Sequence, residues 1–108
     1  MQLTKDSKSI LYTLYKEYEN RRKLGFSREK SKQFDSASTI REEFFSDLLL
    51  EDVEDSLREL GRNGFLINRY ADDTVYFCQL SDYGISIMES ETKETLLSIA
   101  DFISKFIP

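Results

Sequence analysis

Neighbouring pairs of carboxylates are the residues of this chain best suited to chemistry. Paired acids can bind Mg²⁺ or divide the roles of general acid and general base. Three pairs stand beside apolar residues in helical stretches, where charged faces usually meet water, and one stands in a turn, where Asp is favoured. We therefore expect solvated charges and no metal or catalytic site there. The pairs are Glu42-Glu43, Glu51-Asp52, Glu54-Asp55 and Asp72-Asp73.

Composition argues against most other kinds of catalytic site. The chain has no His, so it lacks the base that activates Ser or Cys nucleophiles. Its one Cys, Cys78, lies in a predicted strand, where a thiol is usually an inert core residue, and a zinc site needs several ligands. The four Gly residues form no phosphate-binding loop. We predict a noncatalytic protein without cofactor or metal, and a small enzyme is the least favoured interpretation.

Length and composition indicate a single globular domain over residues 1–108. The apolar fraction is 40% and the charged fraction 32%, an ordinary mixture for a folded domain. No stretch approaches the roughly 20 apolar residues that cross a bilayer, and the N-terminus lacks an apolar signal core. A lone Cys cannot form an internal disulfide. We expect a cytoplasmic protein with no membrane partner.

The charge of the chain is distributed unevenly. The formal net charge is −5. Residues 1–34 carry nine Lys/Arg against four Asp/Glu, a net of +5, and residues 35–108 carry six against sixteen, a net of −10. The low overall pI argues against nonspecific nucleic-acid affinity, but the asymmetry leaves room for a local basic surface.

Three helices are predicted before the first extended run. Residues 7–23 form the first, with Asp6 or Ser7 as its cap and Gly25 after its end. Residues 26–37 are a polar loop that can include a short strand. The second helix spans Ser38 to Phe45, with Ile40, Phe44 and Phe45 facing inward. Residues 50–63 form the third, with Leu50, Val53, Leu57 and Leu60 on one side.

A β-hairpin and two further helices complete the predicted elements. Residues 65–70 and 74–80 are rich in β-branched and aromatic residues, and a short polar turn at 71–73 joins them. A helix capped by Ser81 runs to about Glu89, and an amphipathic helix covers 92–107. Three helices followed at once by a two-stranded hairpin are typical of a winged helix, so we predict an α+β winged-helix domain with additional C-terminal helices.

Two stretches resemble a known family. Leu57-Arg58-Glu59-Leu60-Gly61-Arg62-Asn63-Gly64-Phe65-Leu66 resembles the third helix and wing entry of many bacterial winged-helix proteins. The tail from Leu80 to Ile107 is similar to the YjcQ-like proteins of bacteria and their prophages. The resemblance covers residues 48–108 and implies a winged-helix fold and a prophage-linked role, with no catalytic residues to carry over. The long basic segment before the second helix departs from the family.

A winged helix usually reads DNA with its third helix, and here that helix is acidic. The outward face of 50–63 holds four acids and two bases, and the predicted wing tip is Asp72-Asp73. The positive charge lies elsewhere, in a segment that either contacts phosphates or is a solvated helix end and loop. The residues expected to bind nucleic acid are Arg21, Arg22, Lys23, Arg28, Lys30, Lys32 and Arg69.

The sequence is compatible with two classes of function. The first is a noncatalytic winged-helix module that acts as a prophage-linked transcriptional regulator or accessory DNA-binding protein. The alternative is a protein–protein interaction module that uses its acidic third helix without touching DNA. The last helix packs on the first helix or forms a homodimer. The residues expected to bind a partner are Glu51, Glu54, Asp55, Arg58, Leu96, Ile103 and Phe106.

Overall fold

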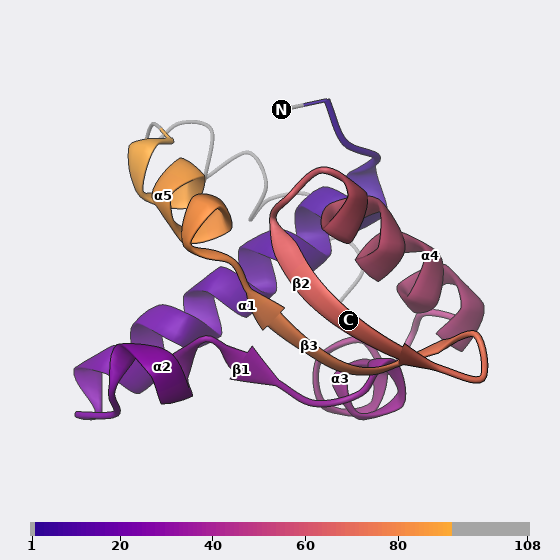
Figure 1. Cartoon of the computed structure of the whole chain (residues 1–108), viewed down its shortest axis with the longest axis horizontal. Helices are drawn as coiled ribbons and strands as arrows, with labels where there is room; N and C mark the ends of the chain where they lie inside the picture. Colours follow the sequence, from indigo (N-terminus) through magenta and orange to yellow (C-terminus); the bar gives the residue numbers. More distant parts are fainter. Residues whose placement is uncertain (1, 92–108) are drawn as a thin grey trace.

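Residues 2–91 are described by the computed structural model, and they form a mixed α+β domain of five helices and three short strands (Figure 1). The α+β class is therefore confirmed. The predicted helix 92–107 lies outside the described residues. The helices are α1 (Lys5–Lys23), α2 (Arg28–Ser31), α3 (Ala37–Phe44), α4 (Leu50–Arg62) and α5 (Asp82–Ser90). The strands are β1 (Gln33–Phe34), β2 (Leu66–Ala71) and β3 (Thr74–Leu80).

The three strands form one antiparallel sheet in the order β1-β3-β2. The predicted hairpin is confirmed, and its turn at Asp72 and Asp73 has positive φ angles of 52° and 61°. Two left-handed residues give a turn whose twist matches that of the strands, and Asp tolerates this conformation better than most residues. The register shifts between Arg69 and Tyr70, which indicates a bulge near the turn.

The core lies between the sheet and helices α1, α3 and α4. Buried side chains come from α1 (Ile10, Leu11, Leu14), from α4 (Val53, Leu57, Leu60) and from β3 (Val75, Cys78, Leu80). The period of three to four residues in the helices is the pattern that predicted them. Ile40 and Phe45 are buried as expected, and Phe44 packs partly buried beside them.

Local capping interactions set where the helices begin. Ser81 Oγ accepts a hydrogen bond from the Gly84 amide at 2.8 Å, which confirms Ser81 as the cap of α5. The cap of α1 is Thr4 rather than Asp6 or Ser7, so that prediction was wrong. A side chain at Gly84 would overlap the Phe65 carbonyl oxygen, so this residue lets α5 pack against the start of the hairpin.

Two predictions need correction, one about the stretch 26–37 and one about the start of α4. The polar stretch 26–37 contains the short helix α2 as well as a strand, because Ser27 caps α2 by accepting from the Lys30 amide. Leu50 does not join the buried side of α4 and is 43% exposed. It is the first residue of that helix, where the chain turns away from the core. None of the described helices is long and apolar enough to span a membrane.

Candidate binding surfaces

Chemically reactive groups are scarce in the described part of the chain. No cluster of three or more His, Cys, Asp or Glu residues there could hold a metal ion. Cys78 is fully buried, as expected of a core residue, and burial raises the pKa of its thiol to about 12. The thiol therefore stays protonated at neutral pH, and it is unreactive because only the thiolate is nucleophilic. The candidate sites are surfaces, and they are formed mainly by charged side chains.

Arg21 belongs to the predicted nucleic-acid segment, but it is used within the fold. Its guanidinium pairs with Glu17 at 3.2 Å and donates to the Gln33 carbonyl at 2.7 Å. The same group lies over the Phe34 ring, 4.5 Å from its centre. These contacts tie the end of α1 to β1. A phosphate would have to displace several partners at once, so Arg21 is poorly placed to contact DNA.

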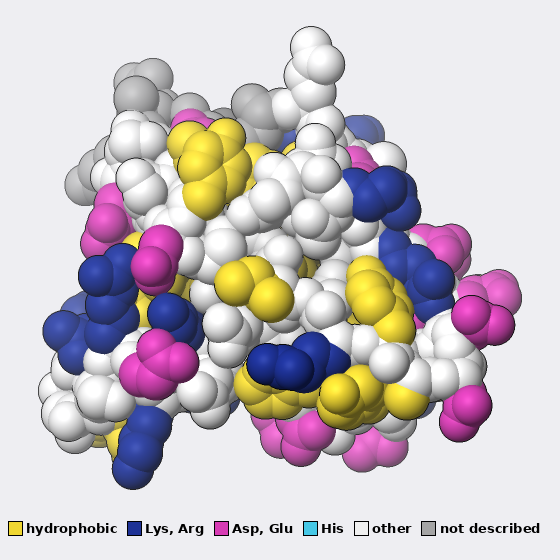
Figure 2. Space-filling view, viewed as in Figure 1, with side chains coloured by type: hydrophobic (Ala, Val, Ile, Leu, Met, Phe, Trp, Pro, Cys, Tyr) yellow, Lys and Arg dark blue, Asp and Glu magenta, His cyan; other side chains and the backbone are white. Residues whose placement is uncertain are grey.

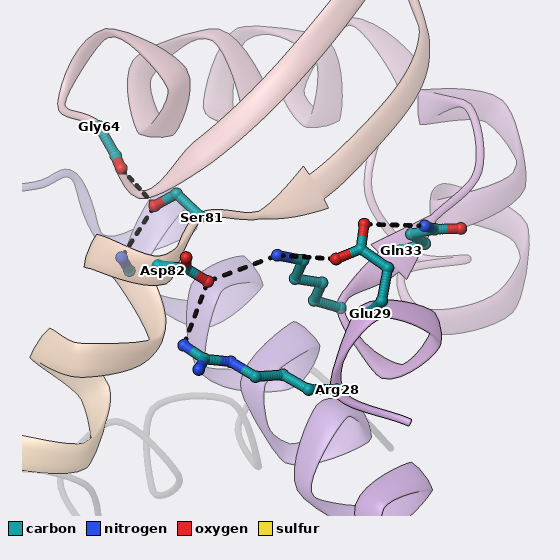
Figure 3. Close-up of polar contacts among 8 residues, drawn as sticks. Arg28, Glu29, Gln33, Gly64, Ser81 and Asp82 are labelled. Atoms are coloured by element: carbon teal, nitrogen blue, oxygen red, sulfur yellow. Dashed lines mark hydrogen bonds and ion pairs between the residues drawn. The ribbon is translucent and has the colours of Figure 1, made fainter. Parts of the chain in front are cut away.

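Arg28 is also paired within the molecule, with Asp82, as Figure 3 shows, and Lys32 pairs with the same carboxylate. Both side chains reach Asp82 at the start of α5, at 3.1 Å from Arg28 and 3.4 Å from Lys32. Lys32 also pairs with Glu29 at 3.2 Å and is only 13% exposed. The hydrogen bond to Glu29 raises the pKa of Lys32, and the Asp82 carboxylate acts in the same direction against the cost of burial. The cluster joins α2 to α5 and neutralises two of the predicted DNA contacts.

Three cations of the segment remain open to solvent, at the corner between α1 and α2. Lys23 and Lys30 make no side-chain hydrogen bond or ion pair within residues 2–91, and Arg22 donates only to the Phe26 carbonyl at 3.1 Å. Leu24 is 71% exposed and Phe26 51% exposed at the same corner. We call the five residues Arg22, Lys23, Leu24, Phe26 and Lys30 the basic corner.

Glu54, a predicted partner contact, instead holds the hairpin against α4. Both carboxylate oxygens accept from the Val75 amide at 3.2 Å, and the side chain is 14% exposed. Arg58 pairs with Glu54 at 3.6 Å, donates to the Asp73 carbonyl and lies over the Tyr70 ring. The bulge explains the need for this contact, because it interrupts the regular ladder next to Val75. Neither Glu54 nor Arg58 is free for a partner.

Glu59 forms a second internal bridge from α4, to the start of α1. It accepts from the Ser7 hydroxyl at 2.7 Å and from the amide and hydroxyl of Thr4 at 3.0 Å and 2.7 Å. Burial alone would raise the pKa of Glu59, but these hydrogen bonds outweigh it and hold the pKa below its ordinary value. The first α1 turn is thus anchored by an ionised carboxylate.

Two further acids of α4 and both acids of the hairpin turn are open to solvent, whereas Asp52 is half-buried. Glu51, Asp55, Asp72 and Asp73 are exposed, and the contacts of Glu54 and Arg58 bring the turn beside α4. Leu49 is 61% exposed at the first turn of α4, next to the half-exposed Leu50. Acidic side chains project over the α4 side of the molecule in Figure 2. We call Leu49, Leu50, Glu51, Asp55, Asp72 and Asp73 the acidic end.

Arg69 does not join the other predicted nucleic-acid residues. It lies on β2, which is the opposite edge strand from β1 and the segment that precedes it. Arg69 and Arg62 are exposed, and neither side chain makes a hydrogen bond or ion pair in the part of the chain that the structure describes. The seven predicted cations therefore do not form one surface. The predicted partner residues Leu96, Ile103 and Phe106 lie outside the described residues.

A shallow hollow of about 450 Å³ lies between α1 and α5, next to the basic corner. Cations and acids both line it, so its charge favours no single class of ligand. Its lining residues are Tyr15, Tyr18, Glu19, Arg22, Lys23, Arg28, Ile85 and Glu89. Burial, followed by the nearby Glu19 carboxylate, raises the pKa of Tyr15 to about 12, so its phenol is protonated at neutral pH. We assign no chemistry to this hollow.

Comparison with protein families, with curated proteins and with solved structures found no match. The YjcQ-like resemblance therefore stays a prediction. Sequence reasoning missed Asp82 and Glu59, which organise much of the charged surface. It also placed Phe26 in a polar loop over 26–37 without singling it out, although an apolar residue among six cations was the signal for an exposed corner.

Proposed function

We propose that this chain is a noncatalytic winged-helix binding module that docks a basic protein surface through its acidic end, without binding DNA. The acidic end carries the proposal, because four open carboxylates lie there beside the exposed Leu49 and Leu50. Protein interfaces commonly combine an apolar centre with a charged rim. A partner with Lys or Arg around an apolar patch would complement both features.

The element order supports the winged-helix part of the proposal. Helix α1, the short helix α2, strand β1, helices α3 and α4 and the β2–β3 hairpin follow one another, with the sheet order β1-β3-β2. In such a domain α3 and α4 would form the helix-turn-helix, and the hairpin would be the wing. The acidic end would then occupy the face that DNA-binding members place against the duplex.

Charge argues against DNA at that face. Phosphate contacts require Lys or Arg, and Arg58 is already engaged by Glu54, Asp73 and Tyr70. Four uncompensated carboxylates would repel the phosphates at short range. The paired cations Arg21, Arg28 and Lys32 leave too few free charges in the basic segment for a strong duplex contact.

Binding of a basic amphipathic peptide tests the proposal directly. The probe is a labelled synthetic helix of Lys and Leu, with the charges on one face, and fluorescence anisotropy gives its affinity. Glu51→Lys/Asp55→Lys should weaken the binding at least about tenfold, because two attractions become repulsions. The wild-type complex should also weaken as salt is added.

A control variant separates local from overall charge. Glu89→Lys/Glu91→Lys makes the same change in net charge at the end of α5, where cations suit the helix dipole. It should change the affinity by less than about twofold. Equal losses in the two variants would contradict a local site. Tight binding of the wild type to duplex DNA at low salt would contradict the exclusion of DNA.

A further inference from the structure

The basic corner projects two large apolar side chains into solvent. Leu24 follows α1 and Phe26 precedes α2, and Gly25 between them has a φ angle of +97° and nothing near its Cα that a side chain would meet. The corner lies at one end of the long axis in Figure 1, opposite the β2–β3 turn. Exposing two large apolar side chains to water has a free-energy cost, and a binding partner that covered them would remove it.

The charges beside the apolar pair are positive and open. Arg22 and Lys23 precede it, and Lys30 follows as the third residue of α2. Glu29 is paired with Lys32, and Glu19, which lines the hollow beside Arg22 and Lys23, is paired with Lys16; Glu89 lines the same hollow. The acidic end is remote, because the seven residues of β3 alone span roughly 20 Å, more than twice the Debye length in physiological salt. An anionic surface at the corner would therefore meet mainly cations.

We propose that the basic corner binds the surface of a membrane rich in anionic lipids. Leu24 and Phe26 would enter the boundary between headgroups and acyl chains, and Arg22, Lys23 and Lys30 would meet the lipid phosphates. The hydrogen bond from Arg22 to the Phe26 carbonyl holds the corner in a closed turn that presents both apolar side chains. The contact would leave the acidic end facing away from the membrane.

The apolar pair distinguishes a lipid surface from other anionic partners. Phosphates of a nucleic acid would use the three cations but would leave Leu24 exposed, because a duplex backbone offers no apolar medium. A flat lipid surface needs no shape complementarity and accepts a projecting corner. The expectation of no membrane partner rested on the lack of a spanning segment, which a surface contact does not require.

Vesicle co-sedimentation of the full chain tests the proposal. Vesicles of phosphatidylcholine with phosphatidylglycerol should bind the protein, and vesicles of phosphatidylcholine alone should not. Lys23→Gln/Lys30→Gln should lower the partition coefficient by about 25-fold at low salt, since each cation near an anionic membrane contributes about fivefold. Leu24→Ser/Phe26→Ser should lower it at least about tenfold by removing apolar burial.

Matched variants elsewhere in the molecule complete the test. Arg62→Gln/Arg69→Gln removes two exposed cations, Leu49→Ser/Leu50→Ser removes two exposed apolar side chains, and neither should change vesicle binding by more than about twofold. Glu51→Lys/Asp55→Lys should keep vesicle binding, which separates this proposal from the peptide-docking function. Equal binding to both vesicle types would overturn the proposal, as would full binding by the Leu24/Phe26 variant. Duplex DNA binding that depends on Lys23 and Lys30, without vesicle binding, would assign the corner to nucleic acid instead.

Discussion

The basic segment 21–32 and the acidic end differ in how many of their charges are paired within the fold. Around α2, three of the six cations are taken up by contacts with Glu17, Glu29, Asp82 and backbone carbonyls. Around the start of α4 and the hairpin turn, four acids are exposed to solvent, and the nearby Arg58 is engaged in contacts with Glu54 and Asp73. A count along the sequence gives the first region a large positive charge, but the folded surface is weakly positive there and strongly negative at the other end.

The difference shows that the partner of a charge decides its role. Arg21 and Arg22 are neighbours of the same type, yet Arg21 holds β1 and Arg22 mainly faces solvent. Glu51 and Glu54 differ in the same way on α4. Such neighbouring pairs let the comparison be tested by single substitutions with matched controls.

The largest effect is expected at Arg21. Arg21→Ala removes the ion pair with Glu17, the hydrogen bond to Gln33 and the contact with Phe34. We expect a loss of about 2 kcal/mol in the free energy of unfolding, measured by urea denaturation. Arg22→Ala should lose less than about 0.5 kcal/mol. Equal losses would mean that the basic segment does not divide into paired and open cations.

A somewhat smaller effect is expected at Glu54. Glu54→Ala leaves the Val75 amide without its acceptor and removes the partner of Arg58. The expected loss is about 1.5 kcal/mol by urea denaturation, with faster amide exchange at Val75. Glu51→Ala, three residues earlier, should stay within about 0.5 kcal/mol of the wild type. A large loss at Glu51 would show that the acidic end is structural.

Glu59 should give the fold a dependence on acid pH. Its folded pKa lies below the ordinary value of 4.5 that the unfolded chain retains. Ionised Glu59 therefore stabilises the fold fully above that value, and the contribution is lost as pH falls through the folded pKa. Glu59→Gln should cost about 1 kcal/mol at pH 7 and should flatten the acid limb of the stability profile. An unchanged acid limb would contradict the bridge to Thr4 and Ser7.

The smallest effect on stability is expected at Asp82. Because Asp82, Arg28 and Lys32 form a largely exposed ion cluster, Asp82→Asn should cost no more than about 1 kcal/mol. The substitution frees Arg28, whereas Lys32 keeps its pairing with Glu29, so binding of anionic vesicles should rise by up to about fivefold at low salt. Unchanged vesicle binding would show that Arg28 does not reach the surface that the basic corner presents.

Elements with strong periodicity could be predicted from the sequence, and long-range contacts could not. Val53, Leu57 and Leu60 indicated α4, and the β-branched and aromatic runs around Asp72-Asp73 indicated the hairpin. Helix α2 has four residues and buries only Ser31, so no apolar pattern marks it. The cap of α1 was placed two to three residues late because Lys5 and Asp6 carry no apolar signal.

The contacts of charged side chains were harder still to predict, because their partners lie far away in the sequence. Glu59 meets Thr4 across 55 residues of sequence, and Arg28 meets Asp82 across 54. Such partners are brought together by the packing of α1, α4 and α5, so local sequence does not reveal them. The charged side of α4 was predicted as a helical face, but which of its charges remain open depends on where the hairpin turn and the start of α1 lie.

Backbone amide NMR of the full chain during one titration tests the central claim most directly, that the acidic end is the open binding surface. With the Lys–Leu amphipathic peptide, we expect shift changes in residues 47–55 and at the 72–73 turn, and little change in residues 21–34. With duplex DNA at low salt, we expect no changes at α4. Peptide-induced changes centred on 21–34, or DNA-induced changes along α4, would contradict this account.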